Sequence, residues 1–216
     1  MDVNFFWLDR TLKQLWRGHF SSSDKVLDVG CGEKPRYHDY LPCKPVCSDI
    51  TLTSTTHVLS HAQALSLKSS SFDGVVSVNA LYYCEDPQRA VFEFGRVLRK
   101  NGKLVLVTPF MYPIHDAPFD RYRFTEFGLK EMLEKSFMVE KVVAVGGVFS
   151  LPSLLLHSIH KGLLRITPLA LRPMINTMLF IVLLVPALCG LLISTLNILD
   201  RTRRWPVYYF TVARKK

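Results

Sequence analysis

Short apolar runs separated by polar and amphipathic stretches make up most of the chain. These runs predict the strands of a β-sheet at residues 25–29, 46–50, 57–59, 73–78, 103–108, 139–145 and 207–213. Apolar residues at three-to-four spacing predict helices over residues 4–17, 86–99 and 125–135, and a helix or turn at 37–41. Asn101-Gly102 is expected to cap the second helix. Because buried strands and helices alternate, the pattern predicts an α/β fold with a largely parallel sheet.

One long apolar stretch breaks this alternation. Residues 173–199 contain no charged residue, and a single membrane span takes about 20 residues. The strand predicted at 207–213 has to return to the sheet, and arginines flank the apolar run on both sides, at Arg172, Arg201, Arg203 and Arg204. Both ends are therefore expected on the cytoplasmic side, with a monotopic or re-entrant element bent near Pro186. A single true span, or an apolar lid or dimer interface in a soluble enzyme, remains an alternative.

The sequence thus predicts one domain made of residues 1–149 and 205–216, and a hydrophobic helical insertion at residues 150–204 that associates with a membrane. Residues 151–171 within the insertion are expected to form an interfacial helix. The chain carries a net charge of +9, and nine of its Lys and Arg residues follow residue 150 against the single acid Asp200. Basic residues beside an apolar run favour an anionic membrane surface rather than nucleic acid as the partner, although a basic solvated tail is the alternative.

The cysteines and the N-terminus bear on the compartment. Five cysteines are present, an odd number that is typical of reduced cytoplasmic thiols. Cys43 and Cys47 are four residues apart, without a second pair or clustered histidines, so no metal site is predicted. The first residues do not have the pattern of a signal peptide. These features predict a protein on the cytoplasmic face of a membrane, and they leave its oligomeric state open.

A glycine-containing loop follows the first strand, with the sequence Asp28-Val29-Gly30-Cys31-Gly32. Glycines are needed where the backbone turns tightly and approaches a ligand closely, and in a doubly wound sheet this turn lies at the carboxyl ends of the strands. The position of the third glycine of a nicotinamide-binding loop is Pro35, which disfavours an oxidoreductase. Asp49 ends the second strand, where a carboxylate can accept hydrogen bonds from both hydroxyls of a ribose. A tight structural turn and a surface acid are the alternatives at these two places.

These motifs come in a familiar order: VLDVGCGEKP, then SDI, then ALSLKSSSFDGVVSVNAL, then RVLRKNGKLVLVTPF. From residue 25 to about 148 the chain resembles the class I S-adenosylmethionine-dependent methyltransferases of the methyltransferase-11-like group. The resemblance implies a Rossmann-like seven-stranded sheet with helices on both faces, in which the last strand, 207–213, runs antiparallel. It also implies S-adenosylmethionine as the cofactor. The apolar insertion precedes that last strand.

The resemblance also implies a set of cofactor-binding positions: Asp28, Gly30, Cys31, Gly32, Asp49, Ile50, His61, Ala62, Leu65 and Asn79. Gly30 and Gly32 would flank the methionine moiety with Asp28 near its amino group, and Asp49 would hold the ribose. Ala62 and Leu65 would line the adenine, and Asn79 would end the fourth strand beneath the cofactor. The sequence departs from the family where His61 replaces an acid that reaches the adenine amino group, and where Tyr82-Tyr83 replaces Glu-His.

Methyl transfer from a sulfonium is a direct displacement that needs alignment and exclusion of water, and an oxygen acceptor often needs a base. Residues 109–124 supply titratable side chains among aromatic ones, a mixture that suits a sugar or another hydroxylated ring. His115 is the candidate base because histidine titrates near neutral pH, and Asp120 and Tyr83 are further catalytic candidates. Similar loops recur in methyltransferases that resemble surface-glycan enzymes. Alternatively, His115 and residues 120–123 form a hydrogen-bonded brace.

Together these features predict a methyltransferase that acts on a lipid-linked or amphipathic acceptor at a membrane surface, with a glycan or glycolipid hydroxyl favoured. A quinone-like or fatty acceptor is second. A catalytically silent Rossmann-like membrane adaptor is the alternative of a different class, and binding of S-adenosylmethionine would distinguish the two.

Overall fold

The structure, a computed structural model, describes residues 13–33, 35–151 and 204–216, together with residues 154, 155, 158, 159, 162, 163 and 168. Of the helix predicted at 4–17, residues 13–17 are described: residues 13–16 are helical and residue 17 begins a turn. The apolar run at 173–199, its flanking Arg172, Arg201 and Arg203, and the bend predicted at Pro186 lie outside the described residues.

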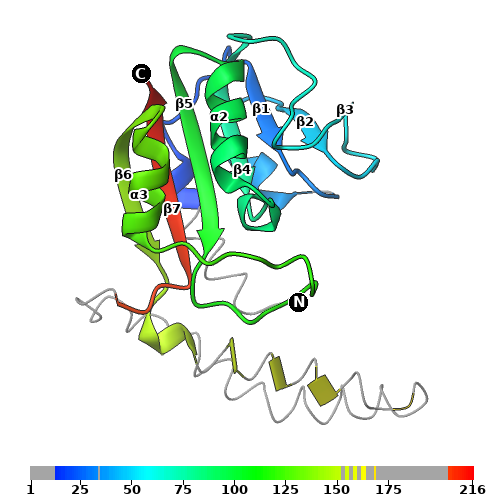
Figure 1. Cartoon of the computed structure of the whole chain (residues 1–216), viewed down its shortest axis with the longest axis vertical. Helices are drawn as coiled ribbons and strands as arrows, with labels where there is room; N and C mark the ends of the chain where they lie inside the picture. The colour runs from blue at the N-terminus through cyan, green and yellow to red at the C-terminus, as the bar shows by residue number, and fades with distance from the viewer. Residues whose placement is uncertain are drawn as a thin grey trace. The chain divides into compact units, whose positions relative to one another are not determined.

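Seven strands form one sheet among the described residues, in the order β3-β2-β1-β4-β5-β7-β6 (Figure 1). Their bounds are β1 Val26–Val29, β2 Val46–Asp49, β3 Val58–Leu59, β4 Phe72–Val78, β5 Leu98–Pro109, β6 Phe137–Val145 and β7 Tyr208–Lys215. Neighbours among β1 to β5 pair in parallel, whereas β7 runs antiparallel to β5, with Val105 opposite Val212. This arrangement confirms the Rossmann-like sheet and the antiparallel last strand that the sequence predicted.

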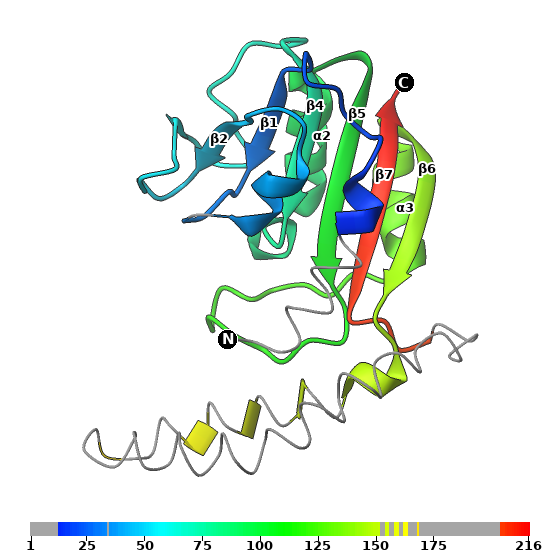
Figure 2. The same cartoon turned by 180° about the vertical axis from the view of Figure 1, so that it is seen from behind.

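Two α-helices cover one face of the sheet. In α2, Pro87–Val97, Asp86 caps the first turn by accepting a hydrogen bond from the Arg89 amide, and the inner face is buried through Ala90, Val91, Phe94 and Val97. In α3, Glu126–Glu134, the Thr125 hydroxyl accepts the amide of Gly128. The helical residues 13–16 lie on the opposite face (Figure 2), where Trp16 packs edge-on against Phe210 of β7. Helices therefore lie on both faces, as expected.

The predicted cap at Asn101-Gly102 is wrong. The second helix ends at Val97, because Leu98 is already extended and pairs with Phe72 as the first residue of β5. Asn101 has a positive φ of 63°, so Asn101 and Gly102 form an irregularity within the strand instead. β6 likewise begins earlier than the apolar run suggested, at Phe137, whose side chain is fully buried.

The chain divides into two compact units. One comprises residues 12–110, 114–143 and 208–216 and contains nearly all of the sheet; the other comprises residues 1–11, 111–113 and 144–207. In the second unit, residues 154, 155, 158, 159, 162 and 163 are helical. Among the described residues, no helix has the length and apolar character needed to cross a membrane.

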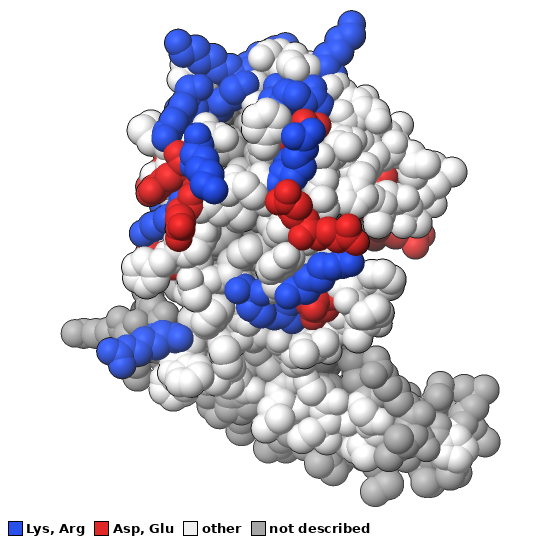
Figure 3. All heavy atoms as spheres, in the orientation of Figure 1, with Lys and Arg blue, Asp and Glu red and all other residues white. Residues whose placement is uncertain are grey.

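Basic side chains of the first unit gather at one edge of the sheet. Because β7 runs antiparallel to β5, the start of β5 and the end of β7 lie side by side, which brings Lys103 opposite Arg214. Figure 3 shows Lys and Arg crowding the end of the molecule at which the C-terminus lies. The parallel strands run away from this end (Figure 1), so their carboxyl ends lie at the opposite, less basic edge.

Candidate functional site

A cavity of about 580 Å³ opens at the edge of the sheet where the parallel strands end. Its walls come from the ends of β1, β2 and β4, from the turn at residues 60–62 and from the loop that follows β5. A volume of several hundred Å³ is typical of a site for a small molecule or cofactor. Eight of the predicted site residues line it: Gly30, Gly32, Asp49, Ile50, His61, Ala62, Asn79 and Tyr83.

The two glycines of the loop after β1 serve different purposes. Gly30 has a φ of +75°, and a Cβ atom there would lie 2.2 Å from the Cβ of Ala80, so only glycine fits. Gly32 has a φ of +61°, but a Cβ there would meet nothing within 4 Å. Gly30 thus lets the backbone pass the end of β4, while Gly32 leaves open space beside a cavity that it lines.

Asp49 is held in place by the backbone around it. One carboxylate oxygen accepts the amide of Gly32 at 2.8 Å and the other accepts the amide of Thr51 at 2.9 Å. A carboxylate oxygen has two lone pairs, so each oxygen can still accept a hydrogen bond from a ligand hydroxyl. The end of β2 therefore presents a pre-oriented acceptor pair to the cavity.

The turn after β3 forms another part of the wall. Ala62 lines the cavity beside His61, whose Nδ1 accepts the amide of Gln63 at 3.2 Å. Since Nδ1 acts as an acceptor, Nε2 is the nitrogen that carries the proton in the neutral ring. His61 thus offers a donor at the position where the family resemblance implied a carboxylate. Asn79 lines the cavity at the end of β4, and its side-chain oxygen has no hydrogen-bond partner among the described residues.

Asp28 lies beneath the glycine loop and does not line the cavity. Its carboxylate is fully buried and accepts hydrogen bonds from the Tyr37 hydroxyl at 2.7 Å and from Nε2 of His38 at 2.6 Å. Burial raises the pKa of Asp28, while the bonds from His38 and Tyr37 oppose that shift. The structure therefore places Asp28 with two residues of the 3-10 helix η1, Arg36–Tyr40.

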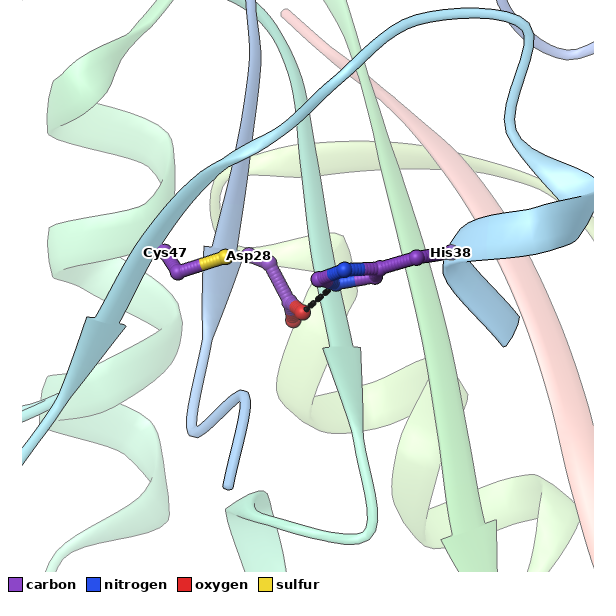
Figure 4. A group of neighbouring side chains, drawn as sticks. All are labelled: Asp28, His38 and Cys47. Atoms are coloured by element: carbon purple, nitrogen blue, oxygen red, sulfur yellow. Dashed lines mark hydrogen bonds and ion pairs between the residues drawn. The ribbon is translucent and has the colours of Figure 1, made fainter. Parts of the chain in front are cut away.

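Asp28, His38 and Cys47 form a cluster in which one ligand-type atom from each residue lies within 4.8 Å of the others (Figure 4). Cys31, between the two glycines, is also buried, and a bond from Cys47 lowers the pKa of its thiol. Cys31 therefore belongs to the wall between β1 and β2 rather than to the cavity lining.

Leu65 also lies outside the lining, because it is anchored to helix α2. Its amide donates to Glu93 at 2.8 Å, and its carbonyl accepts from Arg96. Arg96 holds the pKa of Glu93 below its usual range. This ion pair fixes the segment that follows the cavity wall.

In another part of the cavity wall, two consecutive tyrosines of η2, Leu81–Tyr83, pair with two consecutive residues of the loop after β5. The inner pair joins the Tyr82 hydroxyl to His115 Nε2 at 2.7 Å. The outer pair joins the Tyr83 hydroxyl to Asp116 Oδ2, also at 2.7 Å. Of these four residues, Tyr83 and Asp116 line the cavity.

His115 and Asp120 form the inner part of the loop. Asp120 has a fully buried side chain that is paired with Arg123, accepts the amide of His115 at 3.0 Å and lies 3.3 Å from its Nδ1. Arg123 holds the pKa of Asp120 below its usual range. The structure thus places His115 and Asp120, two of the three predicted catalytic residues, in the brace that the sequence left open as the alternative.

Sequence reasoning missed Tyr37, His38, Ala80, Phe119 and Asp116 as residues that shape the site. The first two are separated from Asp28 by an irregular turn, and Ala80 matters only because Gly30 approaches it. Asp116 stood in the predicted loop, and its φ of +52° is a backbone feature without a sequence signal at an aspartate. Phe119 and Arg121 also line the cavity.

Comparison with known proteins gives one family match and several similar folds. Residues 27–106 match a methyltransferase domain family, and a search of curated proteins finds no match. The fold is similar to the [4+2]-cyclase SpnF, with a TM-score of 0.61 and 17% identity over 95% of this chain and 80% of that one. It is also similar to SAM-dependent methyltransferases from Methanosarcina mazei (TM-score 0.55, 16% identity, 93% of this chain and 96% of that one) and Aquifex aeolicus (0.51, 18%, 66% and 86%).

S-adenosylmethionine fits the residues at the glycine end of the cavity. Gly32 leaves room for a ligand against the backbone, and Asp49 presents oriented acceptors for a ribose. Asn79 adds a polar group at the wall whose oxygen lacks a partner among the described residues, and a buried acceptor of this kind is stabilised by a ligand donor. The acids that line the cavity, Asp49, Glu85 and Asp116, also favour a positively charged ligand.

Proposed function

We propose that the chain is a class I methyltransferase that uses S-adenosylmethionine and that it methylates a lipid-linked or amphipathic acceptor at the cytoplasmic face of a membrane. The methyltransferase-domain match at residues 27–106 and the similar fold of solved methyltransferases support the first part. The acceptor that we favour carries a glycan or another hydroxylated group. The observation that carries this proposal is an exposed apolar stripe on the helical residues that follow β6. No nucleic acid is expected as a partner.

The stripe consists of Leu155, Ile159 and Leu163, whose side chains are 62%, 49% and 36% exposed. Residues four apart lie on one face of a helix, so the three form a single row, while the neighbouring Leu154 is buried. Exposed apolar area costs about 25 cal/mol for each Å² left in water, and contiguous apolar patches mark sites of protein or membrane contact. The row supports the interfacial helix predicted at 151–171.

The loop beside the cavity also exposes apolar side chains. Ile114 is 79% exposed and Phe119 is 59% exposed, and Phe119 lines the cavity. An acceptor with both an apolar and a polar part would contact such a loop with the former and enter the cavity with the latter. This supports an amphipathic acceptor over a small, fully polar one.

In this proposal one set of cavity residues binds the cofactor and another set binds the acceptor. The glycine loop and Asp49 bind and orient the cofactor, which supplies an electrophilic methyl group on a positively charged sulfur. The aromatic residues Tyr83 and Phe119 cover another part of the cavity and exclude water from the reacting atoms. These residues would hold the acceptor against the cofactor, and alignment of the two is the main catalytic requirement of a displacement.

The acceptor is tested with tritium-labelled S-adenosylmethionine and a total lipid extract, in which label should enter a product that partitions into the organic phase. Hydrolysis of the product then separates a glycolipid from a quinone-like or fatty acceptor. Label that stays in water-soluble products would contradict an amphipathic acceptor.

Membrane contact is tested by flotation with vesicles of phosphatidylcholine and phosphatidylglycerol. The triple change Leu155→Glu, Ile159→Glu and Leu163→Glu should reduce the fraction that floats. The matched control is Phe127→Glu with Met138→Glu, two exposed apolar residues of the sheet unit, which should float as the unchanged protein does. Equal flotation of the triple variant and the control would remove the support that the stripe provides.

A further inference from the structure

We propose that the acceptor atom is a hydroxyl oxygen and that Asp116, held by Tyr83, is the catalytic residue that takes its proton. This inference rests on methyl transfer as the function, but it does not require the acceptor to be a lipid. It replaces His115 as the candidate base and assigns the part of the cavity that Asp116 lines.

The position of the Asp116 side chain is set by its backbone and by a hydrogen bond from Tyr83. Its φ of +52° lies in the left-handed region, which few residues other than glycine, asparagine and aspartate adopt. Such a backbone is kept where the surrounding structure requires it, and it occurs often at functional sites. Tyr83 donates its hydroxyl to Asp116 Oδ2 at 2.7 Å, and both side chains line the cavity.

Tyr83 is a positioning residue that remains a donor throughout. Burial raises the pKa of Tyr83 to about 12, so its hydroxyl stays protonated near neutral pH. It therefore fixes one carboxylate oxygen of Asp116, whereas the other, Oδ1, has no hydrogen-bond donor among the described residues. That oxygen can accept a proton from a hydroxyl bound in the cavity.

His115 cannot take this role in the same arrangement. Its Nε2 is bonded to the Tyr82 hydroxyl at 2.7 Å, and its Nδ1 lies 3.3 Å from the buried carboxylate of Asp120. Both ring nitrogens are thus engaged inside the loop, and His115 is not part of the cavity lining. The bond between Tyr82 and His115 therefore supports the loop, and the bond between Tyr83 and Asp116 lies at the cavity.

The groups around Asp116 suit a hydroxylated ring. Arg121 lines the cavity beside Glu85, to which it donates at 3.0 Å, and it also donates to the carbonyl of Tyr83. The cavity wall thus offers a donor, the Arg121 guanidinium, beside two acceptors, the carboxylates of Glu85 and Asp116. Such a mixture matches the hydroxyl groups of a polyol, each of which both donates and accepts a hydrogen bond. Phe119 adds an exposed ring for packing. Two carboxylates, Glu85 and Asp116, disfavour an anionic acceptor.

The atoms and charges of the step balance. As the acceptor oxygen forms its bond to the methyl carbon, the bond from that carbon to sulfur breaks and its electron pair stays on sulfur. The hydroxyl proton passes to Asp116 Oδ1. The positive charge on sulfur and the negative charge on Asp116 are both lost, so no further reactant is needed.

The test uses the full chain loaded with S-adenosylhomocysteine, and methyl β-D-glucopyranoside as a hydroxylated ring without a lipid. Saturation-transfer NMR should show contact between the protein and the sugar ring. Asp116→Asn and Phe119→Ala should each weaken the apparent affinity about tenfold or more. Asparagine tolerates the left-handed backbone, so calorimetry should show that Asp116→Asn binds S-adenosylhomocysteine as before. Phe127→Ala, at an exposed phenylalanine outside the cavity, is the control for Phe119→Ala.

Transfer of tritium to the same glycoside tests the chemistry. Asp116→Asn should lower kcat about 100-fold or more, whereas Tyr83→Phe should lower kcat with little change in KM because the ring that packs on Tyr82 is kept. Absence of NMR contact in the unchanged protein, or equal contact and kcat in Asp116→Asn, would overturn the inference. Because the glycoside has no lipid, these results are independent of vesicle flotation, so either proposal can fail alone.

Discussion

Replacing Gly30 by alanine should destabilise the protein by about 2–5 kcal/mol, and the structure separates this loss into two parts. A residue with a side chain at the observed φ of +75° loses about 1–2 kcal/mol through its left-handed backbone. The added Cβ would also lie 2.2 Å from the Cβ of Ala80, and overpacking of a well-packed site costs about 1–3 kcal/mol.

The second part can be removed without touching the loop. Changing Ala80 to glycine takes away the atom that clashes and leaves its Cα at 3.6 Å from the new methyl group, an ordinary contact. The double variant Gly30→Ala/Ala80→Gly should therefore regain about 1–3 kcal/mol relative to Gly30→Ala. Ala80→Gly alone should cost only about 0.5–1 kcal/mol, from the greater freedom of its unfolded backbone.

Urea unfolding followed by circular dichroism measures each free energy, and Gly32→Ala is the matched control. Its φ is +61° but its Cβ would meet open space, so it should lose only about 1–2 kcal/mol and gain nothing from Ala80→Gly. Its methyl group would instead enter the cavity and weaken cofactor binding. The reasoning is refuted if Ala80→Gly fails to restore Gly30→Ala, or restores Gly32→Ala equally.

Three further results are expected. Asp49→Ala should weaken S-adenosylhomocysteine binding at least about tenfold in calorimetry, since hydrogen bonds to a charged group are worth about 1.5–3 kcal/mol; unchanged affinity would place the ribose elsewhere. Burial raises the pKa of Asp28 above 3.8 in the folded protein. The stability that the protonated Asp28 contributes is therefore lost as pH rises through the raised pKa. The melting temperature of Asp28→Asn, measured relative to the unchanged protein, should increase from about pH 4 to pH 7. Arg96 lowers the pKa of Glu93 below 4.5, so its contribution is lost as pH falls; Glu93→Gln should cost about 1–3 kcal/mol at pH 7 and less near pH 3.

The fold could be predicted from the sequence because its strands are short, apolar and separated by turns. The run DGVVSV marks β4, whose residues Val75 and Val76 are fully buried. The last strand could be assigned as antiparallel only through the family resemblance, since apolar periodicity carries no strand direction. The helix end at Val97 was missed because Leu98 and Arg99 continue the helical spacing, and the pairing of Leu98 with Phe72 decides against it.

The cofactor end of the cavity could be predicted because each of its parts is local. A strand end, two glycines and a carboxylate at the next strand end lie within about 20 residues of one another, and parallel pairing brings the strand ends together. The burial of Asp28 could not be predicted in the same way. It depends on Tyr37 and His38 folding back over the strand through η1, and no periodic pattern encodes that turn.

The part of the cavity that we propose for the acceptor is built from contacts between segments 33 residues apart, in which neighbours along the chain take opposite roles. Tyr82 and His115 pair on the inside, and Tyr83 and Asp116 pair on the cavity side. A shift of one residue in either segment would break both pairs and place Tyr83 opposite His115 or Tyr82 opposite Asp116. Composition alone could therefore identify the loop but not the residue that lines the cavity. Histidine was the natural choice by its titration range, yet the ring of His115 is bonded inside the loop, whereas Asp116 lines the cavity. In the proposed mechanism the register between the two segments therefore selects the base, while the glycine loop and Asp49 are set independently by β1 and β2.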